Sequence, residues 1–333
     1  MTAATDRQAV GAALLQAERL CLVTHERPDG DALGSLLGAY HLLRALGKDV
    51  VMVVAAADLP LPHEYGFLDI SPALTVLPGD LADRTVVYLD CGNIDRNPVS
   101  LEGTAHGPVL NIDHHHDNTR FGDVNWVDGA AACTAEMLWL LAADLGVPLS
   151  REIGEPLYVG LVTDTGKFMY ENSSPRAHRM AAELIEAGVP AHAIYRKLYE
   201  GVPLAKLELL GRALAALERY DDGALALVTL ACEDFDAVGA SDSDSEGIID
   251  HLRALEGTKV AAFARSRERP NGNGQVTRKV SLRSSDGEVD VSAIARAGGG
   301  GGHRQAAGFS TELDDDALRA FLRDQIAAQR SRA

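Results

Sequence analysis

The chain has 333 residues, of which 46% are hydrophobic, and it carries a formal net charge of −17 from 31 basic and 48 acidic side chains. Its length favours two domains, each with enough apolar residues for a packed core. The acidic excess argues against binding to long duplex DNA or to an anionic membrane, because neutralising their phosphates requires Lys and Arg. A short anionic substrate held in a local basic pocket is compatible with this charge.

The cysteines and the N-terminal residues indicate the compartment. Four cysteines are scattered along the chain without a CxxC pair, which predicts reduced and mostly buried thiols. The first residues lack a basic region followed by an apolar core, which argues against a signal peptide. No stretch of about 18 uncharged apolar residues is found in the chain. We therefore expect a cytoplasmic protein without a membrane span.

Strand-like and helix-like stretches alternate through the first 190 residues. Residues 31–47 and 134–146 are typical of helices that end on a glycine cap, and residues 173–188 predict a further helix. The apolar runs that predict buried strands are 19–25, 48–55, 85–90, 107–115 and the run that ends at Asp164. This alternation predicts a doubly wound parallel sheet of the α/β class.

The rest of the chain is expected to form a helical linker and a smaller domain. We place the first domain at residues 1–190, the linker at 191–220 and the second domain at 221–333, with a long helix over 204–220 as the bridge. The second domain is expected to be α/β with a mixed sheet. Its predicted segments are a strand at 223–231, a helix at 246–257, paired strands at 259–268 and 276–285, and a helix at 314–329.

Acidic and histidine side chains stand at the ends of the apolar runs in the first domain. The carboxyl ends of parallel strands meet at one edge of a sheet, where open α/β sheets place their sites. Carboxylates that converge there repel one another unless cations lie between them. The pattern therefore predicts a two-metal site of the kind that hydrolyses phosphate esters. The predicted ligands are His25, Asp29, Asp31, Asp90, His114 and Asp164.

These ligands can be divided between two metals that share one carboxylate. The expected groups are His25, Asp29 and Asp90 for one metal, and Asp31, Asp90, His114 and Asp164 for the other. Gly30 permits a tight turn, so the carboxylates on either side of it can face different metals. Mixed imidazole and carboxylate ligands favour two Mn²⁺ ions, with Mg²⁺ or Co²⁺ as substitutes. A water between the ions would ionise near neutral pH and attack phosphorus in line.

Two residues beside these ligands are expected to act with the bridging Asp90 in catalysis. His115 follows a ligand directly, and we expect it to bind a phosphate oxygen or to assist the leaving group. Asp113 is expected to orient His114. A single Asp or His at a strand end is more often a helix cap or a structural residue. Several such motifs in one chain are difficult to obtain by chance.

Basic residues gather in the paired strands of the second domain. Residues 265–283 contain six basic side chains and one acid. Arg265 and Arg283 lie in the predicted strands and are the candidates for contacts with substrate phosphate. The alternative is a solvated hairpin, which we favour for Arg267 and Arg269.

A run of five glycines, 298–302, precedes His303. The run shows no packing role in the sequence and costs backbone entropy. We therefore expect Gly300, Gly301 and Gly302 to bring backbone N–H groups close to an anion, with His303 against a substrate phosphate or base. A flexible linker is the alternative.

Together these segments resemble a known family. The chain resembles the DHH phosphoesterase superfamily. The four N-terminal motifs of that superfamily are similar to THERPDGDALGS, VVYLDCG, DHHHDN and VTDTG in this chain, and its DHHA1 domain is similar to KVSLRSS and GGGGGHRQAAGF. The resemblance covers nearly the whole chain in the right order. It points to the NrnA-type branch, which contains nano-RNases and phosphatases of 3′-phosphoadenosine-5′-phosphate (pAp).

The resemblance implies a function and its requirements. The implied activities are release of 5′-mononucleotides from short RNA and hydrolysis of pAp. The implied requirements are Mn²⁺ and a substrate cleft between the domains. In related proteins of this branch the substrates include pApA and cyclic di-AMP. A homodimer is also implied by the resemblance. The metal assignments above match the family pattern residue by residue.

Three alternatives stay open from the sequence. A RecJ-like exonuclease acting on long single strands normally needs further nucleic-acid-binding domains, for which this chain has no room. An inorganic pyrophosphatase shares the first-domain motifs but lacks the GGGHRQAAG pattern. A non-catalytic nucleotide sensor would have no need of a complete set of metal ligands.

Overall fold

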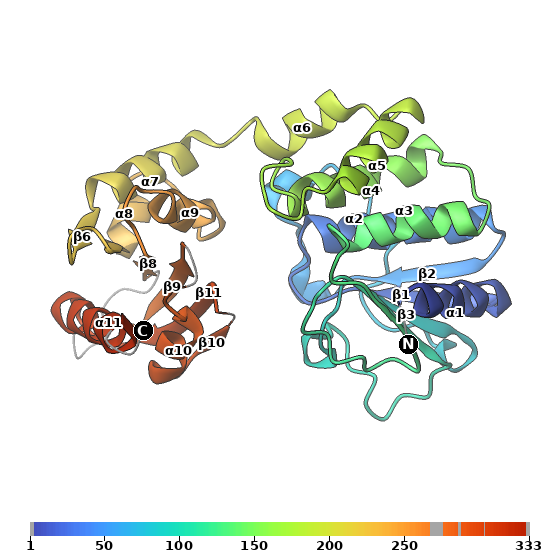
Figure 1. Ribbon diagram of the computed structural model, residues 1–333, viewed down its shortest axis with the longest axis horizontal. Helices are drawn as coiled ribbons and strands as arrows, with labels where there is room; N and C mark the ends of the chain where they lie inside the picture. The colour runs from blue at the N-terminus through green and yellow to red at the C-terminus, as the bar shows by residue number, and fades with distance from the viewer. Residues whose placement is uncertain (1–2, 267–275, 286–287, 303, 331–333) are drawn as a thin grey trace. The chain divides into compact units, whose positions relative to one another are not determined.

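The computed structural model describes residues 3–266, 276–285, 288–302 and 304–330. The chain divides into two compact units, Met1–Glu200 and Gly201–Ala333, each with its own sheet (Figure 1). The segment expected as a linker, 191–220, is divided between them. Helix α6 (Ala191–Tyr199) belongs to the first unit and α7 (Leu204–Ala215) belongs to the second.

The first unit is built on a five-stranded parallel sheet in the order β2-β1-β3-β4-β5. Four strands coincide with predicted apolar runs, whereas β5 was not predicted. The strands are β1 (Arg19–Val23), β2 (Asp49–Val53), β3 (Thr85–Leu89), β4 (Val109–Asp113) and β5 (Val124–Val127). All five end at the same edge of the sheet because they run in parallel, and this edge carries the predicted ligands.

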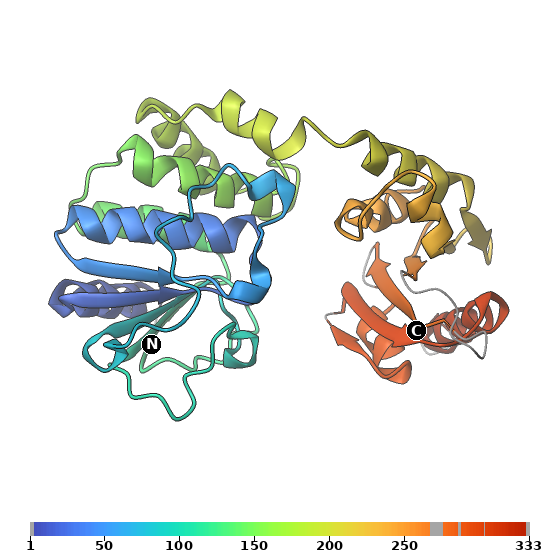
Figure 2. The same cartoon turned by 180° about the vertical axis from the view of Figure 1, so that it is seen from behind.

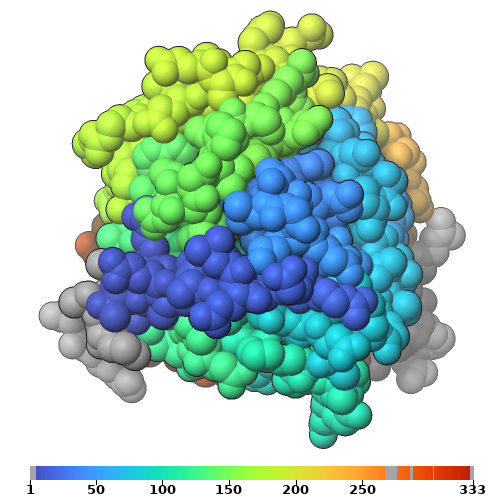
Figure 3. Space-filling view, turned by 90° about the vertical axis from the view of Figure 1, so that its right-hand side faces the viewer, coloured from blue at the N-terminus to red at the C-terminus, as the bar shows by residue number. Residues whose placement is uncertain are grey.

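Helices cover one face of this sheet in two layers. Apolar side chains of that face, such as Leu22 and Leu110, share one core with the helices. Figures 1 and 2 show α2 and α3 directly above the sheet and α4 to α6 further out, and in Figure 3 α1 lies beside α3. The helices are α1 (Ala3–Gln16), α2 (Gly30–Ala45), α3 (Thr134–Asp144), α4 (Arg151–Asp164) and α5 (Pro175–Glu186), together with α6.

The other face of the sheet packs against irregular segments. Tyr88 and Cys21 from this face form a second buried cluster with Leu81, and Val99 and Phe121 pack against it from the connections around β4. The Tyr88 ring meets the Phe121 ring edge-on, with ring centres 5.1 Å apart. The predicted α/β class with a parallel first sheet is therefore confirmed.

The run that ends at Asp164 is a helix, and the prediction of a strand there was wrong. Its residues form α4, and nearly every side chain from Ile153 to Val162 is buried. A helix that is apolar on all sides shows no 3.6-residue period, so its sequence cannot be told from that of a buried strand. Asp164 therefore reaches the site from the end of a helix.

The second unit contains a six-stranded mixed sheet in the order β10-β11-β9-β8-β7-β6. Strands β7 and β8 are parallel and the other neighbours are antiparallel, which confirms the predicted mixed sheet and the pairing of 259–268 with 276–285. The strands are β6 (Glu218–Tyr220), β7 (Leu225–Leu230), β8 (Val260–Arg265), β9 (Arg278–Ser284), β10 (Gly301–Gly302) and β11 (Ala306–Thr311).

Helices pack on both faces of the second sheet. One face forms a core with α10 and α11, through residues such as Ile294 and Leu322, and the opposite face packs on α7, α8 and α9. These helices are α8 (Cys232–Asp236), α9 (Ile248–Arg253), α10 (Val291–Ala297) and α11 (Asp315–Arg330), with α7 already given.

The predicted helix over 204–220 is shorter than expected. Helix α7 ends at Ala215, and the last three residues of the predicted helix form β6, which pairs with β7. Pairing with a strand further along the chain is a tertiary effect that helical propensity does not show. Within the described ranges, no helix combines the length and the apolar character needed to cross a bilayer.

Candidate active site

The turn between β1 and α2 places the first three predicted ligands. His25 stands two residues beyond β1, Asp29 caps α2, and Asp31 lies in its first turn. The Asp29 carboxylate accepts the amide of Asp31 over 3.1 Å, which satisfies an N–H at the start of the helix. The Nδ1 atom of His25 lies 2.8 Å from the Glu26 carbonyl oxygen. Its Nε2 atom lies 4.0 Å from Asp29 Oδ2 and 3.7 Å from Asp90 Oδ2.

Asp90 follows β3 and lies at the centre of the site. It is buried and has a φ of +57°, a left-handed conformation that is unusual for a residue other than glycine. The Thr134 hydroxyl donates to its Oδ1 over 3.0 Å. His114 Nε2 lies 3.6 Å from Oδ1, and His115 Nδ1 lies 3.7 Å from it. Its two oxygens therefore face histidines from different parts of the chain.

Asp31, His114 and Asp164 form a second group on the other side of Asp90. Asp31 accepts the amides of Thr134 over 2.7 Å and of Ala135 over 3.0 Å, so it also caps α3. His114 Nε2 lies 3.9 Å from Asp31 Oδ2 and 3.7 Å from Asp164 Oδ2. The strand edge, the start of α2 and the end of α4 therefore meet at one point.

Asp113 contacts a different histidine from the one expected. It was predicted to orient His114, but its Oδ1 lies 2.7 Å from Nδ1 of His115. The Asn118 amide donates to its Oδ2 over 2.6 Å. Side chains two residues apart at the end of a strand lie on the same side, whereas neighbours point in opposite directions. This alternation pairs Asp113 with His115.

The crowding of charged groups perturbs their pKa values. Burial and the charges of Asp90, Asp164 and Asp29 hold the pKa of Asp31 well above its usual range. Burial, with smaller contributions from Asp90 and Asp29, raises the pKa of Asp164 to about 6 in spite of His114. Burial would also raise the pKa of Asp90, but His25, His114 and His115 outweigh it and hold the pKa low. Burial would lower the pKa of His115, but the hydrogen bond to Asp113 and the charge of Asp90 raise it to about 9.

These residues fit divalent cations. The described part of the chain contains three groups of three residues, and within each group the donor atoms lie within 4.8 Å of one another. Carboxylate oxygens and imidazole nitrogens are ligands for Mn²⁺, Mg²⁺ and similar ions. Cations between them would offset the burial and the mutual repulsion that raise the pKa values of Asp31 and Asp164. The groups are His25, Asp29 and Asp90; Asp31, His114 and Asp164; and Asp90, His114 and His115.

Several supporting residues were missed from the sequence. Asn172 donates to the Asp164 carbonyl oxygen over 3.1 Å and to the Ala132 carbonyl oxygen over 2.8 Å. Buried Glu136 accepts from Arg176 over 2.8 Å, and also from the Ala132 amide. These contacts fix the segment before α3. They follow no helical or strand period, so pattern analysis of a single sequence offers no signal for them.

Thr134 provides a test of this support. Replacing Thr134 by Val removes the hydroxyl that donates to Asp90 while nearly preserving the side-chain volume. We expect kcat/KM to fall by about 10- to 100-fold, which is typical of losing a partner that orients a metal ligand. Activity of Thr134→Val and Thr134→Ser on one substrate, with melting temperatures, would check this. Equal losses in both variants would contradict a role for the hydroxyl.

The predicted phosphate-binding arginines of the second unit lie in different surroundings. Arg265 makes a two-pronged pair with Asp242, at 2.8 and 3.2 Å, so its charge is already matched. Arg283 donates to the Leu282 carbonyl oxygen, and no carboxylate partner is found for it among the described residues. Arg283 is opposite Ala261 in the strand register. Arg265 is four residues further along β8, roughly 13 Å away.

The glycine run has a packing role that the sequence did not suggest. A Cβ atom on Gly300 would lie 2.1 Å from the Gly308 carbonyl oxygen, and one on Gly302 would lie 2.5 Å from the Ala307 Cα. The Gly300 amide donates to the Ala295 carbonyl oxygen. Gly301 and Gly302 are exposed. They pair with β11, which lies between them and β9, the strand that contains Arg283, while His303 lies outside the described residues.

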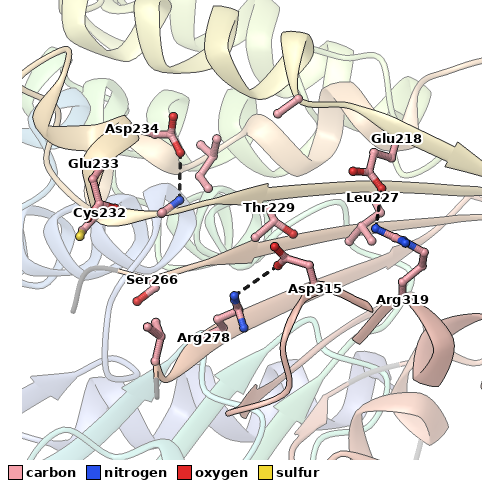
Figure 4. A pocket seen from close by; sticks show the side chains of 14 residues that line it. Glu218, Leu227, Thr229, Cys232, Glu233, Asp234, Ser266, Arg278, Asp315 and Arg319 are labelled. Atoms are coloured by element: carbon pink, nitrogen blue, oxygen red, sulfur yellow. Dashed lines mark hydrogen bonds and ion pairs between the residues drawn. The ribbon is translucent and has the colours of Figure 1, made fainter. Parts of the chain in front are cut away.

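A cavity of about 350 Å³ lies on the face of the second sheet that α11 covers (Figure 4). The Arg278 guanidinium in its wall pairs with Asp315 at 3.3 Å, and that of Arg319 pairs with Glu218 at 3.4 Å. Among the described residues, none that was predicted to bind metal or substrate lines it. Both guanidinium groups in its wall are therefore already paired with carboxylates.

Comparisons with known proteins identify the family. Residues 19–161 match the DHH family, N-terminal domain, and residues 227–328 match the DHHA1 domain. The chain is 36% identical to a bifunctional oligoribonuclease and PAP phosphatase NrnA of Thermus thermophilus, over 94% of this chain and 90% of that protein. It is 27% identical to the NrnA of Bacillus subtilis, over 91% and 92% of the two chains.

A solved structure has the same fold. The crystal structure of an exopolyphosphatase-related protein from Bacteroides fragilis matches with a TM-score of 0.86 and 24% identity, over 98% of this chain and 96% of that one. The chain belongs to the DHH family of phosphoesterases, and it is an enzyme that hydrolyses phosphoric esters. Within the family it is similar to the NrnA proteins, which confirms the resemblance of its motifs.

Proposed function

We propose that the protein is a two-metal phosphoesterase that hydrolyses short RNA to 5′-mononucleotides and pAp to AMP and phosphate. The observation that carries the proposal is the pair of ligand groups on either side of Asp90. The names of the Thermus thermophilus and Bacillus subtilis relatives supply both activities. Two Mn²⁺ ions are the proposed cofactors, with Mg²⁺ or Co²⁺ as substitutes. Dinucleotides such as pApA, and cyclic di-AMP, are further candidate substrates.

We assign the ligands to two ions that share Asp90. His25, Asp29 and Asp90 would hold one ion, and Asp31, Asp90, His114 and Asp164 would hold the other. When bound, the ions would act as Lewis acids on phosphoryl oxygens and lower the pKa of an attacking water.

The remaining residues orient the reacting groups. The Glu26 carbonyl oxygen and the Arg96 guanidinium both contact Nδ1 of His25, at 2.8 and 2.9 Å, which leaves Nε2 to face the site. With its Nδ1 donating to Asp113, His115 is left with Nε2 to contact a phosphoryl oxygen or the leaving oxygen.

The second unit would bind the part of the substrate away from the reacting phosphate. Arg283 and the exposed Gly301 and Gly302 are the proposed contacts, with His303 added from the sequence. A cytoplasmic location and a homodimer complete the proposal; the homodimer rests on family resemblance alone, and solution mass would test it.

Product release tests the proposed reaction. The substrates are pAp, pApA, cyclic di-AMP and RNA of two to twenty-four nucleotides, each incubated with Mn²⁺ and each repeated with chelator. We expect turnover of pAp and of the shortest RNA, with rates that fall as the RNA lengthens. Fast hydrolysis of the longest RNA would instead favour a RecJ-like exonuclease. Tight binding of pAp without turnover would favour a nucleotide sensor.

The two arginines provide a matched pair of variants for the second unit. Arg283→Met should raise KM for pApA by about 10- to 100-fold, because a hydrogen bond to a charged group contributes about 1.5–3 kcal/mol. Arg265→Met should change KM by less than about threefold, since Asp242 already holds that guanidinium and an exposed ion pair contributes little. Steady-state kinetics of both variants checks this. A larger rise in KM for Arg265→Met than for Arg283→Met would instead place the substrate phosphate near Arg265, at the end of β8.

A further inference from the structure

The segment that follows Asp164 has an unusual backbone. Gly166, Lys167 and Phe168 have φ values of +53°, +63° and +64° in succession. Residues other than glycine seldom adopt the left-handed region, and two in a row store conformational strain. Such strain persists only where the surrounding structure fixes it, and it gathers at functional sites.

Hydrogen bonds fix this segment against the metal ligands. The buried Thr165 hydroxyl accepts the Phe168 amide over 3.2 Å, and the Thr165 carbonyl oxygen accepts the amides of Met169 and Tyr170, both over 3.0 Å. At the far end, Asn172 donates to the Asp164 carbonyl oxygen. The backbone of Tyr170 therefore lies against Thr165, the residue that follows Asp164, and its side chain starts from the turn that also carries this ligand.

The strained turn exposes two large side chains beside the site. Met169 is 81% exposed and Tyr170 is 55% exposed, whereas large apolar side chains are usually buried. The Tyr170 ring lies against Gly166, where an added Cβ atom would come within 2.4 Å of it. Phe168 lies between Gly166 and Tyr170 in the sequence, but its ring stacks on His178 instead, at a ring-centre distance of 4.9 Å. The turn thus packs one half-buried ring against His178 and exposes another that lies against Gly166.

A cation lies beside this exposed surface. Lys167 is exposed, and its Nζ atom lies 4.2 Å from the centre of the Tyr199 ring. An aromatic face, a polarisable thioether and an ammonium group are the features that hold a nucleotide by its base and its phosphate. In a chain with a net charge of −17, a cation at this point favours an anionic partner.

We propose that Met169 and Tyr170 form a platform on which one base of a short oligonucleotide stacks while the adjoining phosphodiester lies at the metal ligands. This rests on the proposed function and adds a base-binding subsite in the first unit. Stacking tolerates any base, because every base has a π face. The platform would therefore favour substrates with a base at that position and would discriminate little among the four bases.

Steady-state kinetics on matched substrates tests the platform. The substrates are pApA and its two analogues in which one adenine is replaced by hydrogen. Tyr170→Ala should raise KM for pApA by about 5- to 100-fold, the range expected for losing one base–aromatic stack, with kcat nearly unchanged. For the analogue that lacks the stacked base, the variant and the wild type should have equal KM. Tyr170→Phe should restore the low KM because it retains the ring, and Met169→Ala should give a smaller rise.

A binding measurement gives a second readout that does not need turnover. In the Asp90→Asn background, 2-aminopurine in place of adenine should lose fluorescence on stacking, and adding Tyr170→Ala should abolish this quenching. Leu15→Ala is the matched control, because Leu15 is 51% exposed and its carbonyl oxygen contacts Lys48 at the opposite edge of the sheet.

Two results would overturn the platform. One is an unchanged KM in Tyr170→Ala while the wild type hydrolyses pApA, which would leave the proposed function intact. The other is a fall in kcat on all three substrates with equal KM, which would show that the ring only supports Asp164. A wild type that hydrolyses no nucleotide would count against the proposed function instead, and the 2-aminopurine signal would still report on the platform.

Discussion

Replacing Asp90 by Asn is expected to reduce kcat by more than about 100-fold on every nucleotide substrate. Losing a residue that only orients a metal ligand already lowers metal affinity or activity by about 10- to 100-fold. Asp90 is itself the carboxylate that faces both ligand groups, so its loss should cost more. The asparagine amide has only one oxygen, so it cannot bind a metal ion in each of the two ligand groups. Steady-state kinetics of Asp90→Asn across a Mn²⁺ titration measures the effect.

The control for this variant is a carboxylate outside the ligand groups. Asp95 lies in a short turn beyond β3 and is exposed, with its contacts to Asn93 alone in the described structure. Asp95→Asn should retain activity within about twofold, since surface substitutions seldom change more than about 0.5 kcal/mol. Activity of Asp90→Asn near that of the wild type would show that Asp90 binds no essential ion.

Replacing Gly34 by Ala is expected to destabilise the first unit by about 1–3 kcal/mol or more, the usual cost of overpacking a core. Helices α2 and α4 touch through their backbones at this point. A Cβ atom on Gly34 would lie 2.4 Å from the Pro156 carbonyl oxygen and 2.8 Å from the Gly160 nitrogen. Because α2 carries Asp31 and α4 ends at Asp164, separating the helices should weaken metal binding as well. Urea unfolding with and without Mn²⁺ measures both effects.

Gly211 offers the matched control, because it also lies within a helix, α7, but has no atom within 4 Å of an added Cβ. Gly211→Ala should stabilise the protein by about 0.5–1 kcal/mol, since alanine loses less backbone entropy in a helix. If the Gly34 and Gly211 variants were equally stable, close packing of α2 on α4 would be excluded.

Local sequence signals were sufficient for the strand-borne part of the site. Each of His25, Asp90 and Asp113 follows or ends an apolar run of five or so residues, and β1, β3 and β4 are those runs. A parallel arrangement then brings the strand ends together without further information. The assignment of these residues to one edge of the sheet therefore needed only hydrophobic runs and their polar ends.

Contacts between distant segments could not be predicted in the same way. Asp164 was expected on a strand because α4 is buried on all sides, and its place at the site depends on the close approach of α2 at Gly34 and Gly160. A Cβ atom on Gly160 would lie 2.6 Å from Asp31 Oδ1. Neither glycine marks a turn, so no local rule distinguishes them from other helical glycines.

The basic and glycine-rich segments show the same limit. Arg265 and Arg283 have similar sequence surroundings, but only the folded chain brings Asp242 to the first of them. The glycines at 300 and 302 were expected to face an anion, and their lack of a side chain is required by the strand beside them. Whether a charge is free or matched is a property of tertiary packing.

The number of Mn²⁺ ions bound at saturation, measured together with activity, tests the two-metal account most directly. The protein stripped by chelator would be titrated with Mn²⁺ while bound metal and hydrolysis of pAp are followed in the same samples, for the wild type and for Asp90→Asn. We expect two ions per chain in the wild type, activity that appears as the second ion binds, and at most one tightly bound ion in the variant. Full activity with one ion or none would contradict the account.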